Sequence, residues 1–393
     1  MGNCFGTAKK SAAEIAPSEM IKSQPAVKLY GPPNSFSTSH IRLAILYKPV
    51  TLHFVPSDAH ESPTLIYKSD VVSGSVEDIL RYLDAKFPDP PLTVTNNTTS
   101  SIWGWCGETT PLVVWVVVLQ HRSINWHLER MVKWAEDMVA RGGSVRGDPS
   151  MGSPRMEVKK FGKSYSQLLQ VMLEHAQMEE TVLFQILESA DRGLCKSANE
   201  EHAKHLPIMN GIKEEIKIIG VMNPGSPDYQ EALVNLLSRL KRLKENCKQH
   251  FEEEEKELLP LMEATELNKP QQAKVLQQSL DVMRETHSHL FRFFMEGLRP
   301  HDAMQYFDFI KRYCDNVRPS ATEAGEPVFL LFRVSQSPWS MVHGYHQVQT
   351  VSFSDFTLSC LAGKRLKYRN FTCFKLALFV NSLNCESITG QLV

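Results

Sequence analysis

Two histidine–glutamate pairs in the sequence have the residue types and the spacing of metal ligands. His175 precedes Glu179 in HAQMEETVLFQIL, and His250 precedes Glu254 in HFEEEEKELLPLM. Residues four apart lie on one face of a helix, one turn from each other. Imidazole and carboxylate together suit iron, manganese or zinc. Each pair alone occurs by chance in many helical proteins, but both segments share the longer frame HxxxEExxL[FL], which is hard to explain as coincidence.

The apolar residues around each pair place both pairs on the inward face of their helices. A stripe surrounds His175 (Leu168, Val171, Met172, Val182, Leu183), and another surrounds His250 (Leu240, Leu243, Cys247, Leu258, Leu261). Buried carboxylates are costly unless they are paired or bind a metal. The pattern therefore predicts a pocket for two metal ions. The neighbouring acids, Glu180, Glu252, Glu253 and Glu255, are expected to fall off this face and to solvate the helices.

Two further helical segments each bring histidines to the same pocket. The segment LQHRSINWHLERM contains His121 and His127, and the segment ANEEHAKHLPIMNGI contains His202 and His205. His121 is the better candidate of the first pair, because Ile124, Leu128 and Met131 continue its apolar stripe, and His127 is the alternative. The residues alone do not choose between His202 and His205.

Long helices must position these side chains. Apolar periodicity predicts helices at roughly 111–141, 158–191, 197–219, 228–265 and 270–296, with a shorter helix to about 316. Segments rich in Gly, Pro and Ser separate several of them. This outline predicts an antiparallel helical bundle within residues 111–318.

Residues 111–296 resemble the hemerythrin-like domains of the HHE cation-binding type, in which histidines and HxxxE pairs follow the same order. The resemblance implies an up-down four-helix bundle around a non-haem di-iron centre that binds O2 or senses iron, oxygen or redox state. The implied ligands are His121, His175, Glu179, His202, His250 and Glu254, with Glu179 and Glu254 as bridges. The opening EEH favours His202, although His205 follows at i+3 where oxygen carriers have i+4. Two iron ions are implied, and manganese or zinc would also suit the residues.

The pattern of residues 27–90 predicts a small α/β domain with the element order β-α-β-β-β-α, which is a thioredoxin-like layout. It resembles the N-terminal domain of glutathione S-transferases in LYG, SFSTSHIRLAIL, SPTLIY and GSVEDILRYLDAKFP. The resemblance implies an activating hydroxyl at Ser35 or Ser37 and a cis-proline at Pro63. Only the eight residues 56–63 join the second and third strands, and the stretch has no cysteine. An inactive docking module is therefore favoured over a glutathione transferase-like enzyme.

Joined through a linker (91–110), the α/β domain and the bundle together resemble plant hemerythrin-domain proteins and predict an α+β multidomain chain. A metal-binding protein is favoured over an enzyme, and a membrane-tethered scaffold is the other alternative. The net charge of −1 and the lack of a basic stripe argue against nucleic-acid binding.

The two ends of the chain carry separate expectations. The start, MGNCFGTAKK, predicts a disordered segment (1–26) acylated at Gly2 and Cys4. There is no secretory signal, and the longest apolar run, 111–119, is too short to span a bilayer. We therefore expect a cytoplasmic protein, which acylation of the N-terminus would attach to the cytosolic face of a membrane; the alternative is an unmodified tail. Residues 319–393 show no sustained period and predict an irregular tail.

Overall fold

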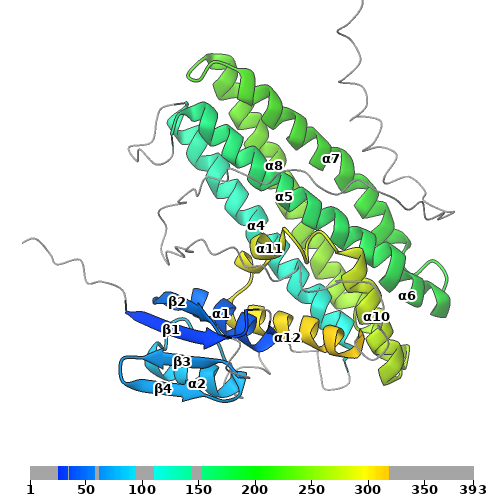
Figure 1. The fold of residues 1–393 in the computed structure, drawn as a ribbon. Helices are drawn as coiled ribbons and strands as arrows, with labels where there is room; N and C mark the ends of the chain where they lie inside the picture. Colours follow the sequence, from blue (N-terminus) through cyan, green and yellow to red (C-terminus); the bar gives the residue numbers. More distant parts are fainter. Residues whose placement is uncertain (1–24, 34, 58–61, 94–109, 144–151, 318–393) are drawn as a thin grey trace, which may run out of the picture. The chain divides into compact units, whose positions relative to one another are not determined.

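The computed structural model describes residues 25–33, 35–57, 62–93, 110–143 and 152–317, and the side chains up to residue 311 (Figure 1). The expected acylation of Gly2 and Cys4 and the expected irregular tail lie outside these residues. No helix among the described residues is long and apolar enough to cross a membrane.

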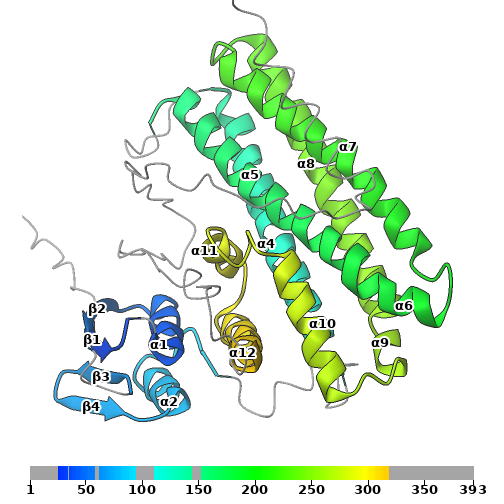
Figure 2. The same ribbon diagram turned by 45° about the vertical axis from the view of Figure 1, so that its right-hand side comes forward.

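The N-terminal part folds as a four-stranded sheet with two helices, in the element order expected from the sequence. Strand β1 lies between β2, to which it is parallel, and β3, to which it is antiparallel, and β4 forms the far edge. Helices α1 and α2 cover one face of the sheet (Figure 2). The elements are β1 (Ala26–Gly31), α1 (Phe36–Leu46), β2 (Thr51–Pro56), β3 (Thr64–Tyr67), β4 (Asp70–Ser73) and α2 (Val76–Lys86).

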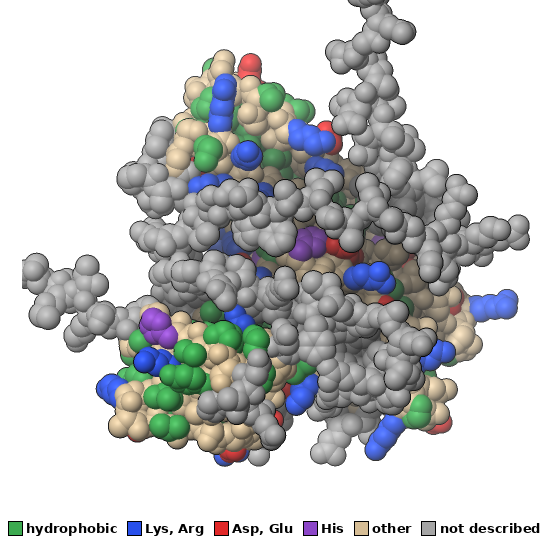
Figure 3. Space-filling view, viewed as in Figure 1, with side chains coloured by type: hydrophobic (Ala, Val, Ile, Leu, Met, Phe, Trp, Pro, Cys, Tyr) green, Lys and Arg blue, Asp and Glu red, His purple; other side chains and the backbone are tan. Residues whose placement is uncertain are grey.

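Buried and exposed side chains alternate along β1, so one face of the sheet is apolar and is covered by the helices (Figure 2). Val27 and Leu29 of β1 are fully buried, because residues two apart point to the same face of a strand. Ser75 caps α2 by accepting a hydrogen bond from the backbone N–H of Asp78, as its position before the helix predicts. Hydrophobic side chains gather on the visible surface of this domain (Figure 3).

Four long helices pack side by side in a ring. In chain order they are α4 (Leu112–Arg141), α5 (Pro154–Met178), α7 (Lys196–Val221) and α8 (Pro227–Glu253). Helix α4 contacts α5 and α8, and α7 also contacts both (Figure 1). Short turns after α6 and α7 make the consecutive helices antiparallel. The ring surrounds a core that receives the inward stripes predicted from the sequence.

Two of these helices contain a turn of π-helix before they continue. Helix α5 passes through Glu179–Leu183 into α6 (Phe184–Ala190). Helix α8 passes through Glu254–Leu258 and a short bend into α9 (Leu261–Ala264). The sequence predicted both segments as uninterrupted helices, so the change of helix type is a correction to that expectation.

The last described elements form an appendage beside the ring. They are α10 (Lys269–Val282), α11 (Phe291–Glu296) and α12 (Pro300–Val317). The continuous helix expected over 270–296 is wrong, because residues 283–290 form turns between α10 and α11. The carboxylate of Glu174 on α5 accepts hydrogen bonds from the backbone N–H groups of Glu285 and Thr286 and from the Thr286 hydroxyl. These bonds satisfy donors that a broken helix leaves free.

Candidate metal centre

Six of the predicted residues meet in the middle of the ring. Helix α4 brings His121, α5 brings His175, α7 brings His202 and α8 brings His250, while Glu179 and Glu254 open the two π-helical turns. All six side chains belong to residues that are 5% exposed or less. Their ligand atoms fall into two groups within which all atoms lie within 4.8 Å of one another. One group holds His121, His175 and Glu179, and the other holds Glu179, His202, His250 and Glu254.

Glu179 is placed between the two pairs of histidines. Its Oε1 atom lies 3.5 Å from Nε2 of His121 and 3.3 Å from Nε2 of His175. Its other oxygen, Oε2, lies 3.4 Å from Nε2 of His202. The carboxylate therefore presents one oxygen to each side of the pocket, as a bridge between two cations requires.

Glu254 repeats this arrangement from the opposite helix. Its Oε2 atom lies 3.4 Å from Nε2 of His121, and its Oε1 atom lies 3.5 Å from Nε2 of His250. The two carboxylates thus face the same space from α5 and α8. The pocket has a pair of imidazoles on each side and two carboxylates between them, which is a donor set that suits metal ions.

The π-helical turns begin at these two carboxylates. The carbonyl of Glu179 accepts from the N–H of Phe184, and the carbonyl of Glu254 accepts from the N–H of Leu259 at 2.9 Å. Each bond spans five residues instead of four. Turns of this type inside α-helices are frequent at functional sites. The repeated sequence frame therefore corresponds to a repeated backbone distortion, which helical periodicity does not reveal.

The pocket atoms lack partners that buried polar atoms normally have. No hydrogen bond reaches Nε2 of His121, Nε2 of His175 or any of the four carboxylate oxygens of Glu179 and Glu254. Buried polar groups without partners are rare and need an explanation such as an ion. A cation between the histidines and the carboxylates provides one, so the residues fit a metal.

The nitrogen atoms of the other histidine pair support the same fit. Nε2 of His202 and Nε2 of His250 lie 2.9 Å apart. The Nδ1 atoms of both rings face carboxylates and donate to them, so each Nε2 faces the pocket and is available to a cation once it carries no proton. Two nitrogen ligands of one metal, at about 2.1 Å each, lie roughly this far from each other.

Each histidine is held from outside the pocket through its Nδ1 atom. The acceptors come from neighbouring helices at 2.9 to 3.0 Å: Glu255 for His121, Gln120 for His175, Glu180 for His202 and Glu201 for His250. Such partners fix the tautomer and the ring orientation of metal-binding histidines. The chain thus orients all four Nε2 atoms toward the pocket.

The roles of Glu180 and Glu255 correct an expectation. Both were expected to solvate the helices, but they hold His202 and His121. Glu252 and Glu253 are exposed, as expected. The available signal was the repeated frame itself, because Glu180 and Glu255 are the second glutamate of each EE pair. Gln120 and Glu201, which directly precede His121 and His202, carried no such signal and were missed.

In the metal-free pocket, the pKa values of His175, His202 and His121 are shifted in different directions. Burial lowers the pKa of His175 to about 3. Burial also opposes the charge of His202, but Glu179 and Glu180 outweigh it and raise its pKa to about 10. The pKa of His121 is likewise raised, against burial, by Glu179, Glu254 and Glu255. The metal-free pocket therefore holds protons at neutral pH that cations must displace.

The two carboxylates of the pocket differ in the same way. Burial opposes the charge of Glu179, but the neighbouring imidazoles of His175, His121 and His202 hold its pKa below the usual value. Burial and the negative charge of Glu179 raise the pKa of Glu254. Each carboxylate disfavours the ionised form of the other, and a cation between them would favour both ionised forms.

Of the two alternative histidines, neither belongs to these groups. His127 donates from Nε2 to the carbonyl of Phe293 at 2.7 Å and stacks on the Phe293 ring. It is a core histidine, and its fallback role as a ligand is wrong. His205 lies beside the pocket with its ring centroid 5.5 Å from that of His250. Its pKa is lowered to about 4 by burial and by the neighbouring His250 and His202.

The glutathione-related residues lie in the N-terminal domain. The Ser35 hydroxyl caps α1 by accepting from the N–H of Thr38 at 3.5 Å, and Ser37 lies in the first turn of that helix. Pro63 is buried just before β3, but the cis peptide bond found among the described residues precedes Pro90 instead. The expectation of a cis-proline at position 63 is therefore wrong.

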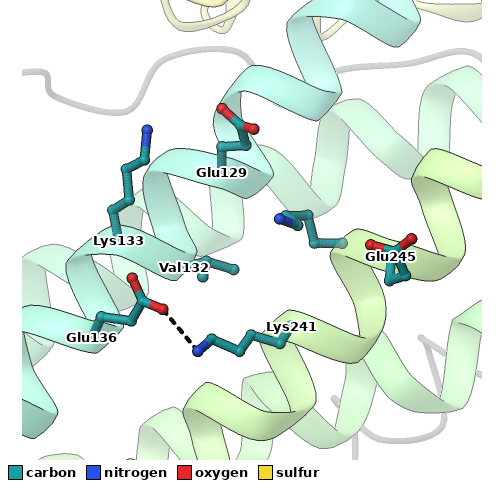
Figure 4. A pocket seen from close by; sticks show the side chains of 7 residues that line it. Glu129, Val132, Lys133, Glu136, Lys241 and Glu245 are labelled. Atoms are coloured by element: carbon teal, nitrogen blue, oxygen red, sulfur yellow. Dashed lines mark ion pairs between the residues drawn. The ribbon is translucent and has the colours of Figure 1, made fainter.

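A surface hollow of about 420 Å³ lies between α4 and α8 and contains none of the pocket residues. Its lining is charged with both signs, and Lys241 forms an ion pair with Glu136 at 2.8 Å (Figure 4). Exposed pairs of this kind contribute little to stability. The hollow is a solvated face of the bundle.

Glu255→Gln is expected to lower metal affinity about 10- to 100-fold, because the substitution weakens the acceptor that orients His121. Glu253→Gln is the matched control, since Glu253 is exposed two residues away and accepts only a local hydrogen bond from Gln249. Competition with a chelator of known affinity measures the effect. Equal affinities for the two variants would contradict an orienting role for Glu255.

Residues 112–262, which contain the pocket, resemble a known protein family. A search of curated proteins finds no match to the chain. The family model of the hemerythrin HHE cation binding domain matches residues 112–262, the stretch that contains all six pocket residues. This part of the chain is therefore similar to the hemerythrin HHE cation binding domain.

Proposed function

We propose that residues 112–262 bind two iron ions and that this centre binds O2 or senses iron, oxygen or redox state. The observation that carries the proposal is the placement of Glu179, whose two oxygens face opposite histidine pairs. Glu254 has the same placement from the other side. A site for one cation would not need two carboxylates that each face both pairs.

In this proposal His121 and His175 would hold one cation, and His202 and His250 would hold the other. The carboxylates of Glu179 and Glu254, which face both pairs, would neutralise their charge. Imidazole with carboxylate suits iron, and iron would supply either O2 binding or a change of oxidation state.

The protein supplies orientation and a dry surrounding. The ring of Phe251 stacks on His121 with 4.1 Å between centroids, and the ring of Phe184 stacks on His202 at 5.9 Å. Both phenylalanines are buried, so they keep water from that side of the pocket. A low-dielectric surrounding strengthens the attraction between cations and carboxylates.

Iron analysis of the full chain tests the proposal. We expect two iron ions per chain after loading with Fe²⁺, and a visible absorption band after exposure to air. His175→Ala and Glu254→Ala should each lower the iron content below one per chain. His127→Gln is the matched control and should keep both ions, because His127 is equally buried but lies outside the pocket.

Two outcomes would sink the proposal. The first is less than one metal per loaded parent chain. The second is a parent-like metal content in both pocket variants. Parallel loading with Mn²⁺ and Zn²⁺ compares the metals, and a clear preference for either one over iron would overturn the assignment of iron.

A further inference from the structure

A chain of buried hydrogen bonds leads from His175 out of the family-matched segment to the appendage. Nδ1 of His175 lies 2.9 Å from Oε1 of Gln120. The side-chain nitrogen of Gln120 donates to the hydroxyl of Tyr306 on α12 at 3.3 Å. That hydroxyl lies 2.8 Å from Nε2 of His287, in the turns between α10 and α11. All four residues are buried.

The far end of this chain is a neutral imidazole, because burial lowers the pKa of His287 to about 4. Its Nδ1 atom has no hydrogen-bond partner among the described residues, whereas its Nε2 atom faces the hydroxyl of Tyr306. A neutral imidazole can accept at Nε2, so it can receive a hydrogen bond from the Tyr306 O–H.

The placement of Gln120 matches this acceptor. The side-chain N–H of Gln120 donates to the Tyr306 oxygen, which leaves the Tyr306 proton for Nε2 of His287. The amide oxygen is then left for His175, whose Nδ1–H donates to it. An amide flipped by half a turn would present N–H to Nδ1 and move the ring proton to Nε2. A protonated Nε2 cannot bind a metal.

The other three histidines do not need such orientation. Their Nδ1 atoms face Glu255, Glu180 and Glu201, and an ionised carboxylate accepts at both of its oxygens. Gln120 directly precedes His121 on α4, as Glu201 directly precedes His202 on α7. Among the four outer partners, the Gln120 amide beside His175 is therefore the one whose orientation determines whether it can accept a hydrogen bond.

A second contact ties the same part of the appendage to α5. Glu174, which directly precedes His175, accepts from the backbone of Glu285 at 3.2 Å, and from the backbone and hydroxyl of Thr286 at 2.8 and 2.7 Å. The turn that carries His287 is thus attached to α5 at the residue next to His175. This attachment keeps His287 and Tyr306 in place relative to Gln120.

We propose that Tyr306 and His287 are positioning residues that select, through Gln120, the metal-binding tautomer of His175. The proposal rests on the proposed metal pocket. It gives the appendage a role in the chemistry of the site, although α12 lies outside the segment that matches the family.

Tyr306→Phe tests the proposal because it removes the hydroxyl and keeps the ring. We expect a fall in the affinity of one of the two metals by about tenfold or more, the size found when outer partners of metal ligands are lost. The probes are Zn²⁺ and Fe²⁺ titrated against a chelator. Tyr165→Phe is the matched control, since its buried hydroxyl donates to the carbonyl of Met209 within the bundle, away from the pocket.

A spectroscopic readout follows the tautomer itself. In the metal-free chain with ¹⁵N-labelled histidine, the His175 signal should report a proton on Nδ1 in the parent and in Tyr165→Phe. In Tyr306→Phe a population with the proton on Nε2 should appear. This readout needs no bound metal, so it decides the inference even if the parent fails to bind iron and the proposed function falls.

Gln120→Glu in the Tyr306→Phe background provides the rescue. A carboxylate at position 120 accepts from His175 in either orientation, so we expect parent-like affinity to return. Unchanged affinity and an unchanged His175 tautomer in Tyr306→Phe would overturn the proposal. An equal loss in Tyr306→Phe and Tyr165→Phe, without rescue by Gln120→Glu, would also overturn it, because a general packing effect would then explain the loss.

Discussion

Glu179→Gln is expected to remove the metal-dependent stabilisation of the bundle. The carboxylate faces both histidine pairs, so its replacement by an uncharged amide would weaken both of the proposed cation sites at once. A ligand present at about 1,000 times its Kd stabilises a fold by about 4 kcal/mol per site. The parent chain should show a corresponding rise in its unfolding temperature with metal, whereas Glu179→Gln should show almost none.

Glu252→Gln is the control for this measurement. Glu252 is exposed and forms only a loose ion pair with Lys248, at 3.8 Å, so the variant should keep the full metal-dependent shift. Thermal unfolding followed by circular dichroism, with and without metal, compares the three proteins. A Glu179→Gln chain that gains as much stability from metal as the parent does would refute the bridging role.

Metal affinity is expected to rise steeply with pH. In the metal-free pocket the pKa of His202 is raised to about 10, because the carboxylates of Glu179 and Glu180 outweigh the effect of burial. Below that pH the ring carries an additional proton, which a metal must displace. Affinity should therefore increase about tenfold per pH unit for each displaced proton, from about pH 6 to about pH 9. Chelator competition at several pH values measures this slope.

Proton release gives an independent check of the same prediction. Metal added to a weakly buffered sample should acidify it, by about one proton for each site that holds a protonated histidine. Glu180→Gln should flatten the pH dependence, because it removes one of the charges that raise the pKa of His202. An affinity that does not change with pH would contradict the protonated metal-free pocket.

The effect of pH on the stability of the metal-free fold is opposite to its effect on metal affinity. A raised pKa means that His202 stabilises the metal-free fold fully below about pH 6.5, its unfolded value. This contribution is lost as the pH rises toward 10. The metal-free chain therefore loses this stabilisation in the pH range where its metal affinity is highest.

Helical periodicity was sufficient to select the inward-facing residues of each helix. It distinguished Glu254 from its three glutamate neighbours, and the structure places Glu254 in the pocket and leaves Glu252 and Glu253 exposed. Burial drives this result, because an apolar stripe has one face that can point into a core. The same argument brought His121 into the pocket and left His127 as the alternative.

Contacts between helices could not be predicted in this way. A helical wheel considers one helix at a time, whereas Glu255 is positioned by a histidine on α4, 134 residues away in sequence. The break after α10 has a similar cause. Glu174 on α5 stabilises the turn at Thr286, and no local signal in the predicted helix over 270–296 reports a partner 112 residues distant. Long-range hydrogen bonds overrode local helical preference there.

The set of outer partners also fixes the charge balance of the site. Five carboxylates face the four pocket histidines: Glu179, Glu180, Glu201, Glu254 and Glu255. In the proposed di-iron state, two ferrous ions would leave this shell with one excess negative charge, and two ferric ions would leave it with one excess positive charge. A sixth carboxylate at position 120 would neutralise the ferric pair and favour it. With glutamine there, the charge of the shell would lie midway between those that balance the two proposed oxidation states.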